Sequence, residues 1–202
     1  MDLSILVISK TYKLVNKLIK SLSDNKYLTE IKSEVLCSWN GLQKDLNKII
    51  VTKDINLRIQ MIKPYNFAIN MNQLINMSTG KYILMINDDV FLDKNSIESG
   101  LNLLIKNKEI GIVGGLLRDR KGFLTHAGVS FNLLNSPYHF FEYLIKLKDV
   151  NLFNRSFFVP ASTGALILSR KDTLTKVKFN ELYNVCGEDI ELCLDVRQIL
   201  GN

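Results

Sequence analysis

The stretch KYILMINDD, residues 81–89, decides the fold class of this 202-residue chain. Its first part, residues 81–86, is a short apolar run, which is typical of a strand buried on both faces of a sheet. The run leads directly into Asn87-Asp88-Asp89. Open α/β sheets bind their ligands beyond the carboxyl ends of parallel strands. The stretch therefore predicts a parallel sheet with a candidate site just after residue 86.

Strand and helix patterns alternate on both sides of this stretch. Strands are expected at residues 3–9, 33–39, 58–62, 81–86 and 110–117. Apolar residues at helical spacing predict helices at residues 14–22, 66–77 and 95–106. Strands that alternate with helices predict βαβ units and a mainly parallel sheet flanked by helices, in the α/β class.

The pattern changes after residue 117. We expect a hairpin or loop at residues 122–131, one or two strands at 157–169, and a helix at 190–200. Residues 137–154 have no clean period and predict an irregular lobe.

Neither a repeat nor a low-complexity linker divides the chain, so we expect a single domain over residues 1–202. Its halves would be residues 1–117 and a smaller mixed half at residues 118–202. The chain stops soon after an apolar run, which suggests a piece cut from a longer polypeptide.

Composition and charge exclude several classes of protein. Hydrophobic residues make up 47% and charged residues 23% of the chain, which indicates a globular protein with a core. With 11 Gly, 3 Pro and 3 Cys, the chain is not collagen-like, disordered or a disulfide scaffold. The net charge of +6 is spread without a block of like charges. We therefore expect no nucleic-acid partner and, at most, peripheral contact with a membrane.

The cysteines and the N-terminus indicate the cellular compartment of the protein. The odd number of cysteines, Cys37, Cys186 and Cys193, predicts reduced thiols, and they are too few for a zinc site. The N-terminus lacks the basic region of a secretory signal, and no apolar run is long enough to cross a bilayer. We expect a cytoplasmic protein, or one held peripherally at the inner face of the membrane.

Two carboxylate clusters are candidates for chemistry. Adjacent carboxylates such as Asp88 and Asp89 repel each other, and they suit a site where Mg²⁺ or Mn²⁺ is held together with a diphosphate. The alternative is a polar turn before the helix that follows Lys94. Glu188 and Asp189 open the last predicted helix, where the helix dipole stabilises acidic residues, but a carboxylate there can also act as a general base.

Common motifs of other enzyme classes are absent. The chain has no GxxxxGK[ST] phosphate loop, no GxGxxG after the first strand and no GxSxG motif. His126 and His139 have no obvious nucleophile partner. The sequence therefore excludes kinases, dehydrogenases and esterases of the familiar kinds.

Taken in order, the polar clusters resemble those of the family 2 glycosyltransferases of GT-A fold. These enzymes transfer a sugar from a nucleotide sugar to an acceptor with inversion. Each motif is weak alone, but their order and spacing are specific. The motifs are Thr11-Tyr12, Asn40-Gly41, Phe67-Ala68 with Asn72 and Gly80, Asn87-Asp88-Asp89, residues 125–129, Thr163-Gly164-Ala165, Phe179-Asn180-Glu181 and residues 187–194.

The resemblance implies roles for individual residues. Asp89 would hold Mn²⁺ or Mg²⁺ on the diphosphate, Asp88 would orient the donor ribose, and Asp189 would be the catalytic base. The remaining nucleotide-binding candidates are Thr11, Tyr12, Trp39, Asn40 and Asn72. The acceptor-side candidates are His126, Thr163, Gly164, Ala165 and Glu188. Residues 1–117 would form the nucleotide-sugar-binding half and residues 118–202 the acceptor-side half.

The implied donor is a UDP-, GDP- or dTDP-sugar. The implied acceptor is a saccharide or a lipid-linked or protein-linked group, as in polysaccharide, lipopolysaccharide or glycoprotein assembly. A structural role in the hairpin is the alternative for His126.

The chain departs from the family pattern after its first two strands. Lys10 stands where many members have Pro, and Lys13 where they have Asn. Trp39 replaces an Asp that often contacts the nucleobase, and it would either stack on a base or pack in the core.

Other protein classes remain as alternatives. A catalytically inactive nucleotide-sugar-binding module is one, and a sugar nucleotidyltransferase is another, although the chain lacks the glycine-rich loop of the latter. A receiver-type signalling domain would need an acidic pair after the first strand, which is absent.

Overall fold

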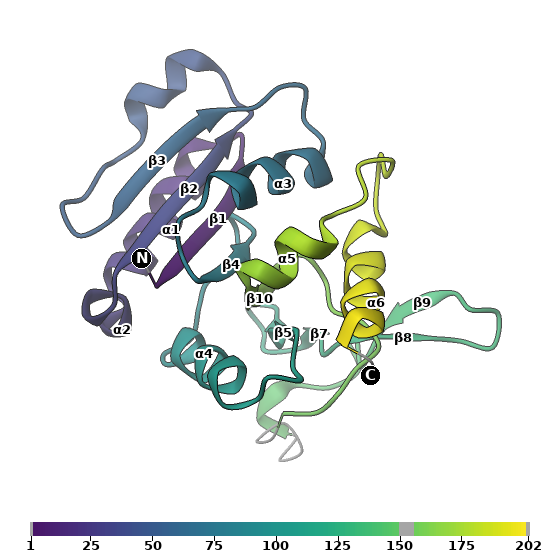
Figure 1. The fold of residues 1–202 in the computed structure, drawn as a ribbon. Helices are drawn as coiled ribbons and strands as arrows, with labels where there is room; N and C mark the ends of the chain where they lie inside the picture. The colour runs from purple at the N-terminus through teal and green to yellow at the C-terminus, as the bar shows by residue number, and fades with distance from the viewer. Residues whose placement is uncertain (1, 150–155, 201–202) are drawn as a thin grey trace.

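The computed structural model describes residues 2–149 and 156–200 of the chain. Its centre is a six-stranded sheet in the order β3-β2-β1-β4-β10-β5 (Figure 1). The strands are β1 (Leu3–Ser9), β2 (Ser33–Trp39), β3 (Asn56–Met61), β4 (Tyr82–Ile86), β5 (Ile112–Gly114) and β10 (Leu166–Arg170). The first four run parallel, and β10 is antiparallel to both neighbours, β4 and β5. The predicted α/β class with a mainly parallel sheet is confirmed.

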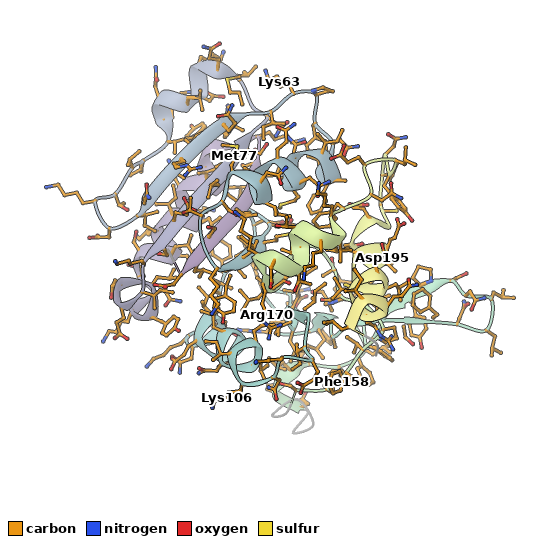
Figure 2. All side chains as sticks on the ribbon, viewed as in Figure 1. Lys63, Met77, Lys106, Phe158, Arg170 and Asp195 are labelled. Carbon is orange, nitrogen blue, oxygen red and sulfur yellow. The ribbon has the colours of Figure 1, made fainter. Side chains whose placement is uncertain are left out.

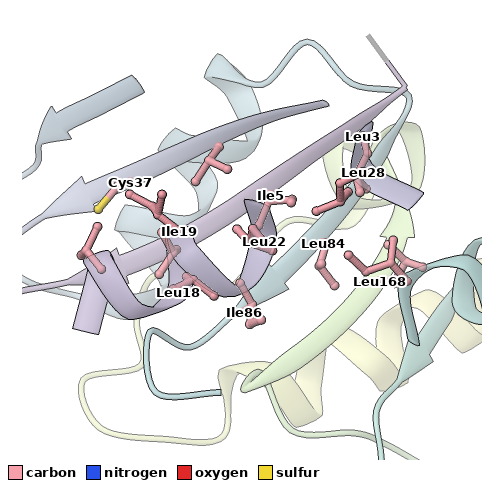
Figure 3. Packing of buried hydrophobic residues seen from close by; sticks show 14 of the residues in the cluster. Leu3, Ile5, Leu18, Ile19, Leu22, Leu28, Cys37, Leu84, Ile86 and Leu168 are labelled. Atoms are coloured by element: carbon pink, nitrogen blue, oxygen red, sulfur yellow. The ribbon is translucent and has the colours of Figure 1, made fainter. Parts of the chain in front are cut away.

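Alternate side chains of each central strand feed two hydrophobic clusters on opposite faces of the sheet. In β1, Ile5 and Val7 join one cluster and Leu6 joins the other. The first cluster is covered by α1 (Tyr12–Ser23), α2 (Lys26–Glu30) and α4 (Ser96–Lys106). The second is covered by α3 (Phe67–Met77), α5 (Lys171–Val177) and α6 (Glu188–Leu200). Figure 3 shows Leu18 and Ile19 of α1 in the first cluster. Both faces are buried, which explains the continuous apolar strands.

The prediction of one continuous strand at residues 110–117 was wrong, because the structure has two short strands there. Strand β5 ends at Gly114, and the chain continues as β6 (Leu117–Arg118) in a separate ribbon. A Cβ atom at Gly114 would lie 2.0 Å from the Ser162 hydroxyl oxygen. The absence of a side chain at Gly114 therefore allows the chain to leave the sheet close to the 162–165 segment.

Two short ribbons replace the single hairpin or loop predicted at residues 122–131. Strand β7 (Leu124–His126) pairs with β6, whereas β8 (Val129–Phe131) pairs with β9 (Pro137–His139). Gly128 separates them with a φ of 110°, a conformation that glycine adopts at little cost. The β8–β9 hairpin extends beyond α6 (Figure 1). The predicted irregular lobe at residues 137–154 thus contains β9 and a 3-10 turn, η2 (Leu147–Asp149), and residues 150–154 lie outside the described part.

Strand β10 brings the second half of the chain into the sheet of the first half. It is one strand within the predicted 157–169 region and runs one residue beyond it. At its end, Arg170 donates to the carbonyls of Leu104, Asn107 and Ile110, near the C-terminus of α4 (Figure 2). A cation is favourable at that end of a helix. The two halves therefore share one sheet.

The predicted helices are present with shifted ends. Helix α4 begins one residue later than predicted, and α6 begins two residues earlier. Helices α2 and α5 and a 3-10 helix, η1 (Gln43–Lys48), were not predicted. In the part of the chain that is described, none of the helices combines the length and apolar character needed to cross a membrane.

Candidate functional site

Three strand ends predicted to carry polar groups meet at one edge of the sheet. The carboxyl ends of β1, β2 and β4 are adjacent because these strands are parallel neighbours. The Ser9 hydroxyl donates to the Asp88 carboxylate. The Asn40 N–H donates to the Ser9 carbonyl oxygen at 2.8 Å. Thr11 and Tyr12 follow directly at the start of α1, so the predicted nucleotide-side residues share this edge, apart from Trp39 and Asn72, which are described below.

The two carboxylates of the acidic doublet, Asp88 and Asp89, differ in solvent exposure. Asp88 is half-buried, whereas Asp89 is exposed. Burial raises the pKa of the Asp88 carboxyl and the Asp89 charge adds to this, while the hydrogen bond from Ser9 acts in the opposite direction. Two like charges at a half-buried edge are stabilised by a cation.

The doublet fits only part of a metal ligand set. Within the described ranges, no three His, Cys, Asp or Glu side chains gather where they could hold a metal ion. Mg²⁺-type sites commonly use one or two carboxylates and complete their shell with substrate phosphates and water. Asp88 and Asp89 fit that kind of site, in which the substrate supplies ligands.

The turn Thr163-Gly164-Ala165 connects the doublet to the last helix. It precedes β10, which is antiparallel to β4, so the turn lies beside the end of β4. The Asn87 N–H donates to the Ala165 carbonyl oxygen at 3.0 Å. The Gly164 N–H donates to Asp189 Oδ2 at 2.6 Å. Motifs separated by about a hundred residues are therefore joined by hydrogen bonds.

The three carboxylates in the first turn of α6 have different surroundings. Asp189 is half-buried, and its second oxygen, Oδ1, accepts from the Ile190 N–H at 2.9 Å. Glu191 accepts from the Asn180 side-chain amide at 3.1 and 3.2 Å. Glu188 is buried, and its Oε2 has no hydrogen-bond partner among the described residues. Burial, followed by the charge of Asp189, raises the pKa of Glu188.

His126 is buried behind the same turn. Its Nε2 accepts from the Thr163 N–H at 3.2 Å, and its Nδ1 lies 2.6 Å from Nδ1 of His139. Burial, with a smaller contribution from His139, lowers the pKa of His126 to about 4. His126 is therefore neutral near pH 7 and anchors the turn from within, which is the structural alternative for this residue.

Trp39 does not face the strand ends. It is 0% exposed, and its indole N–H donates to the Leu42 carbonyl oxygen at 3.2 Å. The ring also packs against Gly41, where a Cβ atom would lie 2.5 Å from it. The structure thus places Trp39 in the core, the packing alternative, because a large apolar ring at the end of β2 is covered by the following loop.

Asn72 likewise lies elsewhere. It is buried in α3, and its Nδ2 donates to the Phe179 carbonyl oxygen and to Glu181, both at 2.9 Å. Its Oδ1 accepts from the Phe179 N–H at 2.9 Å. The Asn72 amide therefore holds the segment that precedes α6 and has no free donor for a nucleotide.

Sequence reasoning missed three contacts of the site, although it had named Phe67 as part of a motif and His139 as a histidine without a nucleophile partner. Ser9 binds Asp88, and His139 binds His126. Phe67 lies against the turn, since a Cβ atom at Gly164 would be 3.2 Å from its ring. Residues 137–154 have no clean period, so no sequence signal predicted the β9 strand that brings His139 to His126, and nothing local to Ser9 or Phe67 pointed to their contacts.

Comparison with known proteins bears on the family and the fold. A family model described as Glycosyl transferase family 2 matches residues 4–168, which is most of the chain. No curated protein sequence matches the chain.

Solved structures show the fold. The mannosyltransferase PcManGT from Pyrobaculum calidifontis, in complex with GDP-Man and Mn²⁺, is similar with a TM-score of 0.67 and 12% identity, over 96% of this chain and 51% of that one. S. aureus TarS 1-349 in complex with UDP-GlcNAc gives a TM-score of 0.63 and 14% identity, over 98% of this chain and 53% of that one. The GT-A fold implied by the motifs is confirmed, and the chain spans about half the length of these structures.

Proposed function

The chain belongs to glycosyl transferase family 2, and on that premise we propose that it transfers a sugar from a nucleoside diphosphate sugar to an acceptor hydroxyl. One observation carries the proposal. Asn87, next to the acidic doublet, binds Ala165, and the adjacent Gly164 binds Asp189. These hydrogen bonds hold two groups of carboxylates at one edge of the sheet. A donor lying across the 163–165 turn would have its diphosphate at one group and its anomeric carbon near the other.

The nucleoside would lie at the ends of β1 and β2. Thr11, Tyr12 and Asn40 would frame the base, and Asp88 would accept from a ribose hydroxyl. Asn40 Oδ1 supports this placement because it is buried and has no hydrogen-bond partner among the described residues. Uracil, thymine and guanine each carry a ring N–H that can donate a hydrogen bond to such an oxygen. The similar structures hold GDP-Man, UDP-GlcNAc and UDP, so UDP-, GDP- and dTDP-sugars are the donors to test.

Asp89, with Asp88 beside it, would hold a divalent cation together with the donor diphosphate. When bound, Mn²⁺ or Mg²⁺ supplies a Lewis acid that neutralises charge on the departing diphosphate. The chemistry of the doublet and the Mn²⁺ in the similar mannosyltransferase structure support this. The carboxylates contribute by fixing where the diphosphate lies.

Asp189 would be the catalytic base. The acceptor oxygen attacks the anomeric carbon, the bond from that carbon to the phosphate oxygen breaks, and the acceptor proton passes to the Asp189 carboxylate. A single displacement of this kind inverts the anomeric configuration. Both Asp189 oxygens accept a backbone N–H, so the carboxylate has a fixed orientation. A general base needs such positioning to act within hydrogen-bond reach of the hydroxyl.

Thr163, Gly164 and Ala165 would shape the floor of the sugar site, where small residues permit close approach of the backbone, and buried His126 would hold Thr163 from behind. Glu188 Oε2, buried and without a partner among the described residues, would meet a hydroxyl of the donor or acceptor. The acceptor would be a saccharide, free or linked to lipid or protein, in the assembly of a surface polysaccharide or glycoconjugate. Free Cys37, Cys186 and Cys193 support a cytoplasmic site of action.

The proposal is tested by donor binding and turnover. Each nucleotide sugar is added with and without Mn²⁺, and melting temperature and release of nucleoside diphosphate are measured. A donor at 100 times its Kd should stabilise the fold by about 2.7 kcal/mol. Transfer should give the inverted anomer by NMR. Stabilisation without any release, with every donor and with acceptor present, would identify the inactive binding module instead.

A further inference from the structure

The two histidines of the chain make a direct contact that the proposed chemistry does not use. His126 lies in β7 and His139 in β9, so the contact connects the two short ribbons. Their Nδ1 atoms are 2.6 Å apart, and their rings are inclined at 71°. A hydrogen bond at this distance needs one protonated and one unprotonated nitrogen.

The other nitrogen of His126 decides the direction of that bond. Nε2 lies 3.2 Å from the Thr163 backbone nitrogen, whose N–H can only donate. Nε2 must therefore present its lone pair, and a neutral imidazole then carries its proton on Nδ1. His126 consequently donates through Nδ1, and Nδ1 of His139 accepts. The Ser162 hydroxyl, also 3.2 Å from Nε2, can donate as well.

The contacts continue from His126 toward the candidate base. Thr163 is held by His126, and the next residue, Gly164, donates to Asp189 at 2.6 Å. Ser162 is tied to α6 through Cys193, because its N–H donates to the Cys193 sulfur at 3.4 Å. Residues 162–164 are thus fixed on one side by the histidines and on the other by α6.

We propose that His139 is a positioning residue for sugar transfer: it fixes the tautomer of His126 that holds the 163–165 turn, and through that turn the Asp189 carboxylate. This inference rests on the proposed function, in which Asp189 is the base. Without an acceptor at position 139, the buried Nδ1–H of His126 is left unpaired, which is costly. The ring then favours the opposite tautomer. Its Nε2–H would face the Thr163 N–H, and two donors cannot form a hydrogen bond with each other.

Two titratable side chains of α6, Cys193 and Asp189, also contact the 162–164 segment. Burial raises the pKa of the Cys193 thiol to about 11, so it is neutral. Asp189 is linked to the histidines by hydrogen bonds through Gly164 and Thr163. The orientation of the His126 ring therefore depends on the acceptor that His139 supplies.

The test compares replacements that differ in acceptor position. His139→Asn places an amide oxygen close to where Nδ1 stood, His139→Leu has similar bulk without an acceptor, and Tyr138→Leu is a control in the same strand. In His139→Leu, kcat should fall roughly 10- to 100-fold, as expected for a misplaced group, with the donor KM within about twofold of wild type. His139→Asn should retain most of the rate, and Tyr138→Leu all of it. If His139→Leu melts far below wild type, His139→Gln, whose acceptor reaches too far, takes its place with the same expectation.

NMR supplies a readout that does not need activity. Ring ¹⁵N spectra of the wild type should show His126 protonated on Nδ1 and His139 unprotonated on Nδ1. The chemical shift of the Gly164 amide proton should change in His139→Leu and stay at its wild-type value in His139→Asn. The inference is overturned by His126 protonated on Nε2, by wild-type kcat in His139→Leu, or by equal loss in the Asn and Leu variants. A wild-type chain that releases no nucleoside diphosphate contradicts the proposed function instead, and the spectra still decide the tautomers.

Discussion

The Gly164 backbone N–H donates to Asp189 Oδ2 at 2.6 Å, although the two residues are 25 positions apart. Gly164 lies two residues before β10, so its position is set by the sheet. Asp189 lies in the first turn of α6, so its position is set by a helix. The hydrogen bond therefore fixes a carboxylate between two rigid elements, which is the support that a catalytic group requires.

Gly164→Ala should disturb this relationship with little loss of fold. The added Cβ atom would lie 3.2 Å from the Phe67 ring and 3.4 Å from the Asp189 Cβ atom, so the turn or the ring must move by a few tenths of an ångström. We expect kcat to fall about tenfold or more. The double variant Gly164→Ala/Phe67→Leu should recover part of the rate, which a double-mutant cycle would measure. Additive effects would contradict a shared contact.

Asp89→Asn should abolish the effect of metal on nucleotide binding. The exposed carboxylate beside half-buried Asp88 is the group best placed to share a cation with a diphosphate. Calorimetric titration with UDP and GDP should show affinity that rises with Mn²⁺ in the wild type and no longer does so in Asp89→Asn. The control is Asp54→Asn, which removes an exposed carboxylate outside the candidate site. An unchanged Mn²⁺ effect in Asp89→Asn would remove Asp89 from the proposal.

Trp39→Phe should lower stability and leave donor affinity intact. The indole is fully buried and donates to the Leu42 carbonyl oxygen. Its replacement leaves a cavity and removes one of the two hydrogen bonds to the Leu42 carbonyl oxygen, which keeps the one from the Asp45 N–H at 3.0 Å, at a cost of roughly 1–3 kcal/mol. Chemical denaturation measures the first effect, and donor titration of the folded protein measures the second. A large loss of donor affinity at unchanged stability would instead favour base stacking.

His126 should make the protein less stable in acid. The unfolded chain takes up a proton on this residue near pH 6.5, whereas the folded chain keeps it neutral down to about pH 4. Between these values the unfolded state binds more protons, so this contribution is fully present above about pH 6.5 and is lost as the pH falls toward 4. Denaturation curves across this range should be less pH-dependent in His126→Asn. Equal pH dependence in both proteins would contradict a buried neutral His126.

The sequence predicted the parallel part of the fold because its signals are local. Residues 3–9 form a short apolar run and residues 33–39 end at the turn pair Asn40-Gly41, and both are interior strands of the sheet with the expected ends. The insertion of β10 between β4 and β5 was not predicted, because strand order depends on pairing between residues far apart. The division of the 110–117 strand depended on close packing of Gly114 against Ser162, which no periodicity reports.

The candidate site was predicted as separate motifs and not as contacts. The acidic doublet, the 163–165 turn and Asp189 were all identified, yet their connection through Asn87 and Ala165 follows from the antiparallel pairing of β10 with β4. Asn72 was assigned to the nucleotide by motif position, and Trp39 either to the nucleobase or to the core. The burial of both residues follows from tertiary packing. His139 was passed over because its partner is 13 residues away in a different ribbon.

The central claim is that Asp189 removes the acceptor proton. Asp189→Asn keeps an oxygen for the Gly164 N–H, loses the hydrogen bond from the Ile190 N–H and removes the proton acceptor. Glu188→Gln and Glu191→Gln are the matched variants in the same helical turn. A base acts in the transition state, so its loss should lower turnover without weakening donor binding.

The most direct measurement is therefore the transfer rate of Asp189→Asn at saturating donor, with the donor Kd determined on the same preparation. We predict a rate about 10² to 10⁴ times lower than wild type, with the donor Kd unchanged. Most of the wild-type rate remaining in Asp189→Asn, with loss of activity in Glu188→Gln or Glu191→Gln, would contradict the assignment.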